Sequence, residues 1–155
     1  MASADRNLLG FASTGRVDKL DVNGNTVERK TFNDHQSYRR ERNILKQVQN
    51  FADKNNVQLM YIEGNYVFLE FVSSRILCDW MRNQDRHSSF TVEDVQRMLL
   101  SCLKALEHFL RVIGRAHFDM KPTNILLSEG KPLKLCDFSN SRNPDSVTGL
   151  QGRLE

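Results

Sequence analysis

The sequence predicts an α+β fold in which a small antiparallel sheet with one helix precedes a mostly helical part. Two turn signals indicate the sheet, because Asn23-Gly24 and Gly64-Asn65 each separate two segments suited to strands. An apolar stripe with helical spacing runs from Val92 to Ile113 and indicates the helical part. No linker, repeat or low-complexity stretch separates the two parts, so we expect residues 1–155 to form one domain.

The strands are expected to form two hairpins in the N-terminal half. Residues 17–22 and 25–32 flank Asn23-Gly24, in which both residues accept a positive φ angle, and they are expected to pair. Residues 57–62 and 66–72 are expected to form the second hairpin.

A helix is expected between the hairpins, over residues 34–49, with Asp34 as its N-cap. Spacings of three and four residues place one set of side chains on the same side of this helix. These side chains are Tyr38, Glu41, Leu45 and Val48.

A longer helix is expected to begin after Thr91. Asp94 completes a capping box with Thr91, and Phe90 and Val95 can form the accompanying hydrophobic staple. Gly114 ends the helix, and all three prolines follow it. The last third of the chain is therefore expected to contain loops and short strands.

Composition excludes several classes of protein. Of the 155 residues, 39% are hydrophobic and 26% charged, and the net charge of +3 argues against a nucleic-acid coat or a polybasic membrane anchor. No apolar run approaches the roughly 18–20 residues that span a bilayer, and the N-terminus lacks the pattern of a secretory signal. The three cysteines are widely spaced without a C-x-x-C pair, so neither a disulfide framework nor a zinc site is expected. We expect an intracellular, cytoplasmic protein, with the nucleus left open, and no nucleic-acid or membrane partner.

Most of the chemical information lies in a segment that begins at His117 and reads His-Phe-Asp-Met-Lys-Pro-Thr-Asn, followed later by Asp137-Phe-Ser. Asn124 lies five positions after Asp119, and Asp137 lies 18 positions after Asp119. These segments resemble the catalytic loop H-R-D-x-K-x-x-N and the metal-binding motif D-F-G of the eukaryotic protein kinase superfamily. The resemblance implies a kinase-like fold, with a small sheet lobe and a mostly helical lobe.

The resemblance also implies roles for four polar residues. Asp119 would be the catalytic base, and Lys121 would carry the charge on the transferred phosphoryl group. Asn124 and Asp137 would hold Mg²⁺, which prefers hard oxygen donors, so ATP and Mg²⁺ are the implied cofactors. Lys121, two positions after the base, is typical of Ser/Thr kinases. The alternative is that these residues only make the hydrogen bonds of a turn. That would account for one such residue but not for four at the family's spacing.

The N-terminal half resembles the family's ATP-binding lobe. A glycine-rich loop of the form G-x-G-x-x-G-x-V, which covers the ATP phosphates, is matched by Gly10, Ala12, Gly15 and Val17. A plain turn explains the two glycines equally well. Lys30 stands at the lysine of V-A-I-K, where it would contact the α- and β-phosphates. Glu41 is the candidate to pair with Lys30, and the alternative is a solvated helix residue.

The base of the nucleotide has candidate partners further along. Residues 69–72, Leu-Glu-Phe-Val, resemble the hinge whose backbone groups bind adenine, which makes Glu70 and Val72 candidate ATP-binding residues. Leu126 is a further candidate by the same resemblance. For Glu70, ordinary strand polarity is the alternative.

The resemblance further implies that Lys30 and Asp137 converge, with the nucleotide between the lobes. Leu45, His117 and Phe138 would stack in the core that links the lobes, and His117 would be structural rather than an acid–base group.

Three substitutions depart from the family pattern. Phe118 replaces the arginine that receives an activation-loop phosphate, so regulation by such a phosphate is not expected. Ser139 replaces the glycine of D-F-G, which is expected to restrict movement of this loop. Glu28 replaces an alanine and would share a strand face with Lys30, where it would be desolvated, repel phosphates and draw Lys30 away from Glu41.

The resemblance covers about residues 7–140, with 7–72 as the sheet lobe and 73–140 as part of the helical lobe. Residues 141–155 are expected to be a mobile remnant of the activation segment. A full family domain continues through A-P-E and a large helical subdomain, so the helix over 92–113 would lack much of its usual cover. We expect its apolar face to be covered by self-association or by a partner.

Three functions fit these residues. The first is a minimal, phosphorylation-independent Ser/Thr kinase acting on a protein substrate, of the compact kind found in viruses or other parasites. The second is a truncated pseudokinase that binds a host kinase or its substrate, which Glu28, Ser139 and the missing helices favour. The third is a fragment of a longer product.

Overall fold

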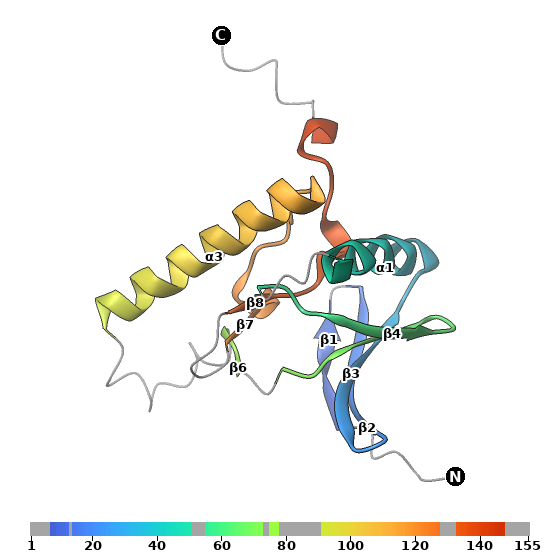
Figure 1. Cartoon of the computed structure of the whole chain (residues 1–155). Helices are drawn as coiled ribbons and strands as arrows, with labels where there is room; N and C mark the ends of the chain where they lie inside the picture. The colour runs from blue at the N-terminus through green and yellow to red at the C-terminus, as the bar shows by residue number, and fades with distance from the viewer. Residues whose placement is uncertain are drawn as a thin grey trace.

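The computed structural model of the chain describes residues 7–12, 14–50, 55–72, 75–77, 91–127 and 133–147. Figure 1 shows a β-sheet with one helix on its face, and a long second helix on the other side of a small sheet. The expected α+β architecture is confirmed. No helix in the described ranges is long and apolar enough to cross a membrane.

The larger sheet has five antiparallel strands in the order β1-β2-β3-β5-β4. The strands are β1 (Asn7–Ala12), β2 (Gly15–Val22), β3 (Asn25–Phe32), β4 (Leu59–Glu63) and β5 (Tyr66–Glu70). Both expected hairpins form, and Asn23, Gly24 and Gly64 adopt the positive φ angles that their turns require. The second hairpin differs from the expected ranges at its ends. Strand β4 begins at Leu59 rather than at residue 57, and β5 stops at Glu70 rather than at residue 72.

The strand register decides which side chains face the site. Glu28 on β3 lies opposite Lys19 and Leu69, and Lys30 lies opposite Val17 and Val67. Directly opposed residues project to the same side of a sheet, so these six side chains share one face. The other face is covered by a small separate cluster of Leu20, Val27 and Phe68.

Helix α1 (His35–Asn50) packs on the face that carries Lys30. Asp34 caps it as expected, because its Oδ1 accepts the Ser37 amide at 2.8 Å. All four side chains expected on the inner side are buried, and Ile44 joins them. The residue Glu41 therefore lies on the buried side of the helix rather than in solvent.

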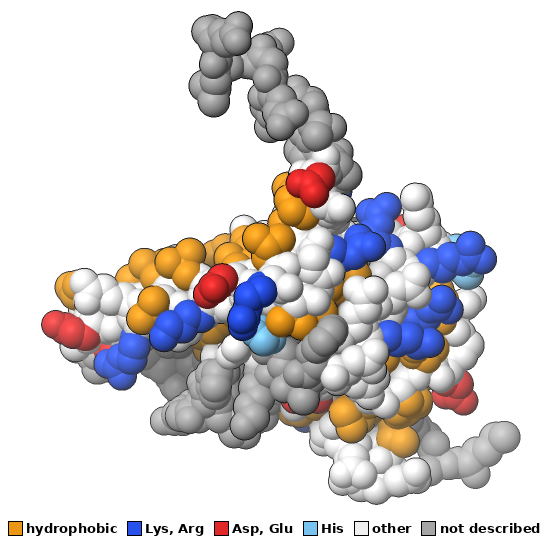
Figure 2. Space-filling model, turned by 45° about the horizontal axis from the view of Figure 1, so that its top comes forward, with side chains coloured by type: hydrophobic (Ala, Val, Ile, Leu, Met, Phe, Trp, Pro, Cys, Tyr) orange, Lys and Arg blue, Asp and Glu red, His pale blue; other side chains and the backbone are white. Residues whose placement is uncertain are grey.

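Helix α3 (Val92–Ile113) begins with the expected capping box between Thr91 and Asp94, and Gly114 ends it at φ 68°. Phe90 lies outside the described residues, so the staple remains a prediction. Of its side chains only Ala105 and Phe109 are buried, whereas Leu99 is 58% and Leu103 63% exposed. Figure 2 shows the resulting line of hydrophobic side chains along the helix.

The last third contains the expected loops and short strands. A three-stranded sheet consists of β6 (Arg75–Ile76), β7 (Ile125–Leu127) and β8 (Lys134–Leu135). The described residues of this third also form the short 3₁₀ helices η2 (Pro122–Asn124), η3 (Phe138–Asn140) and η4 (Pro144–Val147). The segment expected to be mobile thus begins with defined structure, in which Arg142 exchanges two backbone hydrogen bonds with Ala116. Residues 148–155 lie outside the described part.

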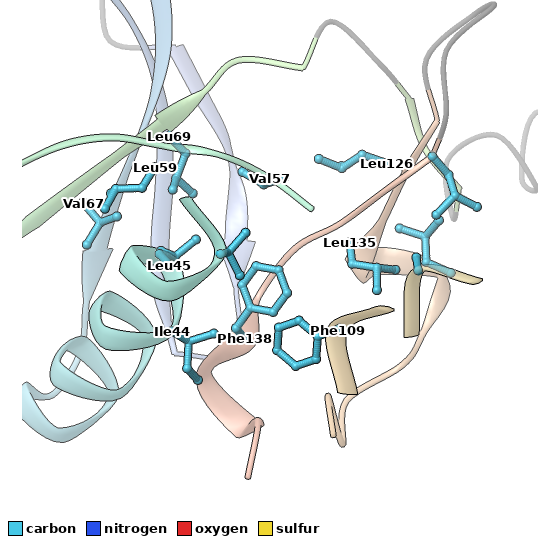
Figure 3. Packing of buried hydrophobic residues seen from close by; sticks show 14 of the residues in the cluster. Ile44, Leu45, Val57, Leu59, Val67, Leu69, Phe109, Leu126, Leu135 and Phe138 are labelled. Atoms are coloured by element: carbon cyan, nitrogen blue, oxygen red, sulfur yellow. The ribbon is translucent and has the colours of Figure 1, made fainter. Parts of the chain in front are cut away.

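One hydrophobic core joins the two parts of the molecule (Figure 3). Phe138 stacks on Phe109 of α3 with ring centroids 5.2 Å apart, and His117 lies 5.4 Å from Phe138. Leu45 of α1 belongs to the same cluster, which confirms the expected packing of Leu45, His117 and Phe138. Phe138, which directly follows Asp137, therefore packs against Phe109 on one side and His117 on the other.

Gly15 at the start of β2 has a steric role. A Cβ atom at this position would lie 1.8 Å from the backbone oxygen of Thr31 on β3. A Cβ at Gly10, by contrast, would meet no atom within 4 Å. Only the second of the two glycines is therefore required by the packing of the described backbone.

The Gly15→Ala substitution is expected to lower the free energy of unfolding by about 1–3 kcal/mol, because β2 and β3 have to separate locally. Gly10→Ala is the matched control, with an expected change within about 0.5 kcal/mol. Chemical denaturation of both variants measures the difference. Equal effects of the two substitutions would contradict the steric role of Gly15.

Candidate active site

The centre of the site is the ammonium group of Lys30. Its Nζ lies 2.6 Å from Glu41 Oε2 on α1 and 2.7 Å from Oδ1 of Asp137, which follows β8. The Lys30 side chain is 3% exposed, and those of Glu41 and Asp137 are 1% and 6% exposed. Residues that are 107 positions apart in the sequence are thus joined by a buried hydrogen-bonded ion pair. The expectation that Glu28 would draw Lys30 away from Glu41 is wrong.

Two buried carboxyl groups share one ammonium group in this cluster. Burial opposes the charge on Lys30, but the carboxylates of Glu41 and Asp137 raise its pKa above the usual value. Burial also raises the pKa of Glu41, the Lys30 ammonium opposes this, and the nearby Asp137 adds to it. Lys30 is therefore held in its charged form, whereas burial and the nearby Asp137 disfavour the charged form of Glu41.

Ser139 holds the Asp137 carboxylate in place. Asp137 itself has a positive φ of 61°, and the Ser139 hydroxyl donates to its Oδ1 at 2.9 Å. The carbonyl of Ser139 accepts a hydrogen bond from Arg40 on α1 at 3.1 Å. The side chain that replaces the family's glycine therefore makes contacts of its own, and Arg40 adds a second link between α1 and this loop.

The second cluster surrounds Asp119. Its Oδ2 accepts hydrogen bonds from Lys121 Nζ at 2.8 Å and from Asn124 Nδ2 at 3.1 Å. Asn124 Nδ2 also donates to the backbone carbonyl of Asp119 at 2.8 Å, which closes the loop on itself. The three residues singled out from the sequence are thus brought together, and the Oδ1 atom of Asp119 has no partner in the described part of the chain.

His117 has a structural role. Its Nε2 lies 3.0 Å from the carbonyl of Cys136, which can only accept, so Nε2 carries the hydrogen and Nδ1 accepts the Asp119 amide at 3.3 Å. Burial lowers the pKa of His117, in keeping with this neutral tautomer. The ring positions Asp119 against the segment that leads to Asp137.

Phe118 lies at the surface. It has a positive φ of 58°, which turns the chain sharply between His117 and Asp119. Its ring is half exposed, and the Arg142 guanidinium lies over it at 5.7 Å. The side chain offers no charge to an anion.

The segment after β5 lies near Glu28. The Glu28 carboxyl is half-buried, and the nearby backbone N–H of Val72 favours its charged form. Burial and, to a lesser degree, the nearby charge of Glu70 raise the pKa of Glu28 to about 7. The expected desolvation of Glu28 is therefore present.

Glu70 is more than an ordinary polar strand residue. Its Oε1 accepts the backbone amide of Gln58 at 2.9 Å and forms an ion pair with Lys134 of β8. This pair joins the five-stranded sheet to the small sheet near the hinge-like segment. Nothing in the sequence marked Lys134 as its partner.

Comparison with known proteins places the chain in a family. A family model described as the protein kinase domain matches residues 19–151. The chain belongs to the protein kinase family. This match begins after the glycine-rich segment, so it does not include Gly10, Ala12, Gly15 or Val17.

Several curated kinases are similar to parts of the chain. Serine/threonine-protein kinase 17A of Oryctolagus cuniculus is 43% identical over 77 residues, which cover 46% of this chain and 19% of that protein. The 3-phosphoinositide-dependent protein kinase B of Dictyostelium discoideum is 33% identical over 100 residues, or 64% of this chain and 10% of that protein. Mitogen-activated protein kinase HOG1 of Scheffersomyces stipitis is 26% identical over 157 aligned residues, or 94% and 39% of the two chains. The chain thus spans less than half the length of these relatives.

The oxygen donors of this kinase chain fit the magnesium ion that its family implies. Asn124 directs its Nδ2 to Asp119, which leaves its Oδ1 as the atom for a cation, and Asp137 supplies a carboxylate. Among the described residues, no three His, Cys, Asp or Glu side chains gather as a ready-made metal site. Mg²⁺ is commonly held by one or two carboxylates together with substrate phosphates, so this pair fits an ion that arrives with a nucleotide.

The structure places one of the remaining kinase-motif residues directly beside Lys30. Val17 is directly opposite Lys30 on β2, and Gly10 is opposite Val17 on β1. Ala12 pairs with Gly15 where β1 meets β2, and Leu126 is buried in β7. Of these residues, Val17 is placed at the site by the strand register.

Sequence reasoning missed one further buried charge in the kinase sheet. Asp18 on β2 is 1% exposed and contacts Arg16 at 2.6 Å and Arg29 at 2.9 Å. Burial raises the pKa of Asp18, but these two guanidiniums outweigh it and the net shift is downward. The residue points away from Lys30, so we assign it to the stability of the sheet. The alternation of side chains along the strand could have indicated the face of the sheet on which Asp18 lies, but not the residues that it contacts.

Proposed function

We propose that the chain is an ATP-dependent Ser/Thr protein kinase that transfers the γ-phosphate of Mg-ATP to a protein hydroxyl. The observation that carries this proposal is the Lys30 ammonium, held between Glu41 and Asp137 at 2.6 and 2.7 Å. A lysine fixed in this way is oriented for phosphate oxygens and pays little further entropy when it binds them. Val17, Glu70, Val72 and Leu126 would contact the nucleotide, and the glycine-rich loop would cover its phosphates.

In this proposal Asp137 and Asn124 hold Mg²⁺ against the phosphates. When bound, the ion neutralises the charge that develops on the transferred phosphoryl group. Asp137 is oriented for this by Ser139 and by Phe138 in the core.

Asp119 would accept the proton of the attacking hydroxyl. Its Oδ2 is occupied by Lys121 and Asn124, so Oδ1 is the atom for the substrate. As the hydroxyl oxygen bonds to the γ-phosphorus, the bond between that phosphorus and the β,γ-bridging oxygen breaks and ADP leaves. Lys121 stands beside the carboxylate, where it can move to the transferred group.

Two finer points of the proposal concern regulation and specificity. Phe118, in place of the family's arginine, gives an activation-loop phosphate no partner, so activity would not depend on that phosphorylation. Lys121 supports a Ser or Thr acceptor over Tyr, in line with the name of the serine/threonine-protein kinase 17A relative.

The Asp119→Asn variant tests the proposal. It is expected to lower phosphate transfer to a protein substrate about 10²–10⁴-fold, because the amide cannot accept the proton. Mg-ATP should still raise the melting temperature of the variant and of the unchanged chain, since binding does not use this carboxylate.

Asp21→Asn, a substitution of an exposed acid on β2, is the matched control and should transfer phosphate normally. Transfer that survives Asp119→Asn would contradict the role of Asp119. A melting temperature that does not move with Mg-ATP would remove the enzyme proposal in favour of the second candidate.

The second candidate is a catalytically weak or inactive pseudokinase that binds another kinase or its substrate. The half-buried carboxyl of Glu28 and the exposed side of α3 favour it. The apolar residues Leu99, Leu103 and Val92, between 58% and 70% exposed, form a face suited to a protein partner or to a second copy of the chain. Self-association through this face is compatible with either candidate function.

Self-association is expected to raise the apparent mass of the chain with concentration in sedimentation velocity. Leu103→Glu should abolish the rise, because a charge on the face cannot be buried. Met60→Glu alters a side chain of similar exposure on β4 and should leave it unchanged. A chain that stays monomeric at all concentrations would contradict this interface.

A further inference from the structure

A cavity on the outer side of α1 is lined mainly by cationic and amide side chains. Its volume is about 350 Å³, within the range of roughly 300–1,000 Å³ that is typical of small-molecule sites. All but one of its lining residues belong to α1, and Arg115 belongs to the segment that follows α3. The lining residues are Gln36, Arg39, Arg40, Asn43, Ile44, Gln47 and Arg115. None of these residues is acidic, and none is one of the kinase-motif residues discussed above.

Three guanidinium groups bring positive charge to this cavity. Those of Arg39 and Arg115 make no hydrogen bond or ion pair with another described residue. Arg40 donates to the backbone carbonyl of Ser139 at 3.1 Å, and its remaining N–H groups have no partner among the described residues. Figure 2 shows Lys and Arg side chains gathered on the side of the molecule that carries α1. The cavity therefore holds several like charges that an anion would bring into balance.

The acids of the same region do not neutralise these charges. Glu41 follows Arg40 in the sequence, but it lies on the buried side of α1 and pairs with Lys30. The hydrogen bonds from Ser37 and, to a smaller extent, the charge of Arg40 lower the pKa of Asp34, the N-cap residue. Asp34 makes no ion pair with Arg40 and does not line the cavity.

The fold holds the donors of this cavity together. Residues 36, 40, 43 and 47 are spaced by three and four positions, so they lie along one side of the helix. Asn43 directs its Oδ1 to the guanidinium of Arg42, which leaves its Nδ2 as a donor. Because Arg40 is already held by Ser139, it loses less conformational freedom when a ligand binds.

We propose that this cavity, the α1–Arg115 cavity, binds a ligand through a phosphate group. A phosphate carries up to two negative charges and three acceptor oxygens, and the planar fork of a guanidinium matches two of those oxygens. A carboxylate offers one charge to the same three cations. The proposal does not rest on the proposed kinase activity. The family's phosphate-binding arginine would stand at residue 118, where this chain has phenylalanine, so the cavity is formed by other positions.

Calorimetric titration with sodium pyrophosphate, without a metal ion, tests the site. Arg39→Gln and Arg115→Gln are each expected to weaken binding about tenfold, because each substitution removes charge-assisted hydrogen bonds to the anion. Two controls remove the same charge from exposed residues outside the cavity: Lys46→Gln on α1 and Arg111→Gln in the last turn of α3. Each control should weaken binding less than about twofold, because exposed charges at a distance are screened.

The comparison of variants locates the anion. Unchanged affinity in both Arg39→Gln and Arg115→Gln would place pyrophosphate elsewhere, for example at Lys30, and would overturn the cavity as its site. Equal losses in all four variants would also overturn it, because net charge alone would then explain the binding. A chain that does not bind pyrophosphate or a phosphopeptide would overturn it as well. None of these results would bear on phosphate transfer from Mg-ATP.

A pentapeptide with one phosphoserine between glycines distinguishes the two sources of the phosphate group. Tighter binding of this peptide than of pyrophosphate would assign the ligand to a phosphorylated polypeptide, and weaker binding would assign it to a free polyphosphate. Either result supports the site if Arg39→Gln and Arg115→Gln weaken it. The same peptide with glutamate in place of phosphoserine should bind at least about tenfold more weakly than the phosphopeptide. Equal binding of these two peptides would overturn the assignment to phosphate.

Discussion

The structure depends on one buried ammonium group that serves two carboxylates. Lys30 comes from a strand, Glu41 from the helix that covers that strand, and Asp137 from a loop on the far side of the core. Leaving any of these charges buried without its partners would cost several kcal/mol, of the order of 3–5. The fold can therefore bring α1 close to the sheet only if the loop at Asp137 closes on it as well.

The surrounding packing makes this arrangement rigid. Phe138, directly after Asp137, stacks on Phe109 of α3 and packs beside His117, which in turn holds the amide of Asp119. One aromatic cluster thus couples the metal-binding loop to the catalytic loop. Ser139 and Arg40 add polar links from the same loop to α1. The two polar clusters of the site are positioned by a shared hydrophobic core.

Much of this could be predicted from the sequence, because local patterns carry the information. The turn at Asn23-Gly24, the cap at Asp34 and the end of α3 at Gly114 each depend on a few neighbouring residues. The pairing of Lys30 with Glu41 followed from family motifs, although their spacing is short. The family motifs identified the residues that converge at the site, and the match to the protein kinase domain agrees with these motifs.

Long-range partners could not be predicted in the same way. Alternation along β3 placed Glu28 on the same face as Lys30, but it says nothing of the direction in which each side chain leans along the strand. In the structure Lys30 pairs with Glu41 and Asp137, whereas Glu28 makes no ion pair with Lys30. The ion pair of Glu70 with Lys134 likewise joins distant segments that share no pattern.

A double-mutant cycle on Lys30 and Asp137 tests the central claim most directly. The free energies of unfolding are measured for Lys30→Met, for Asp137→Asn and for the chain that carries both. If the ammonium bridges the two parts of the fold, the double substitution costs less than the sum of the single ones, by at least about 1 kcal/mol. Costs that add to within about 0.5 kcal/mol would contradict a contact between Lys30 and Asp137.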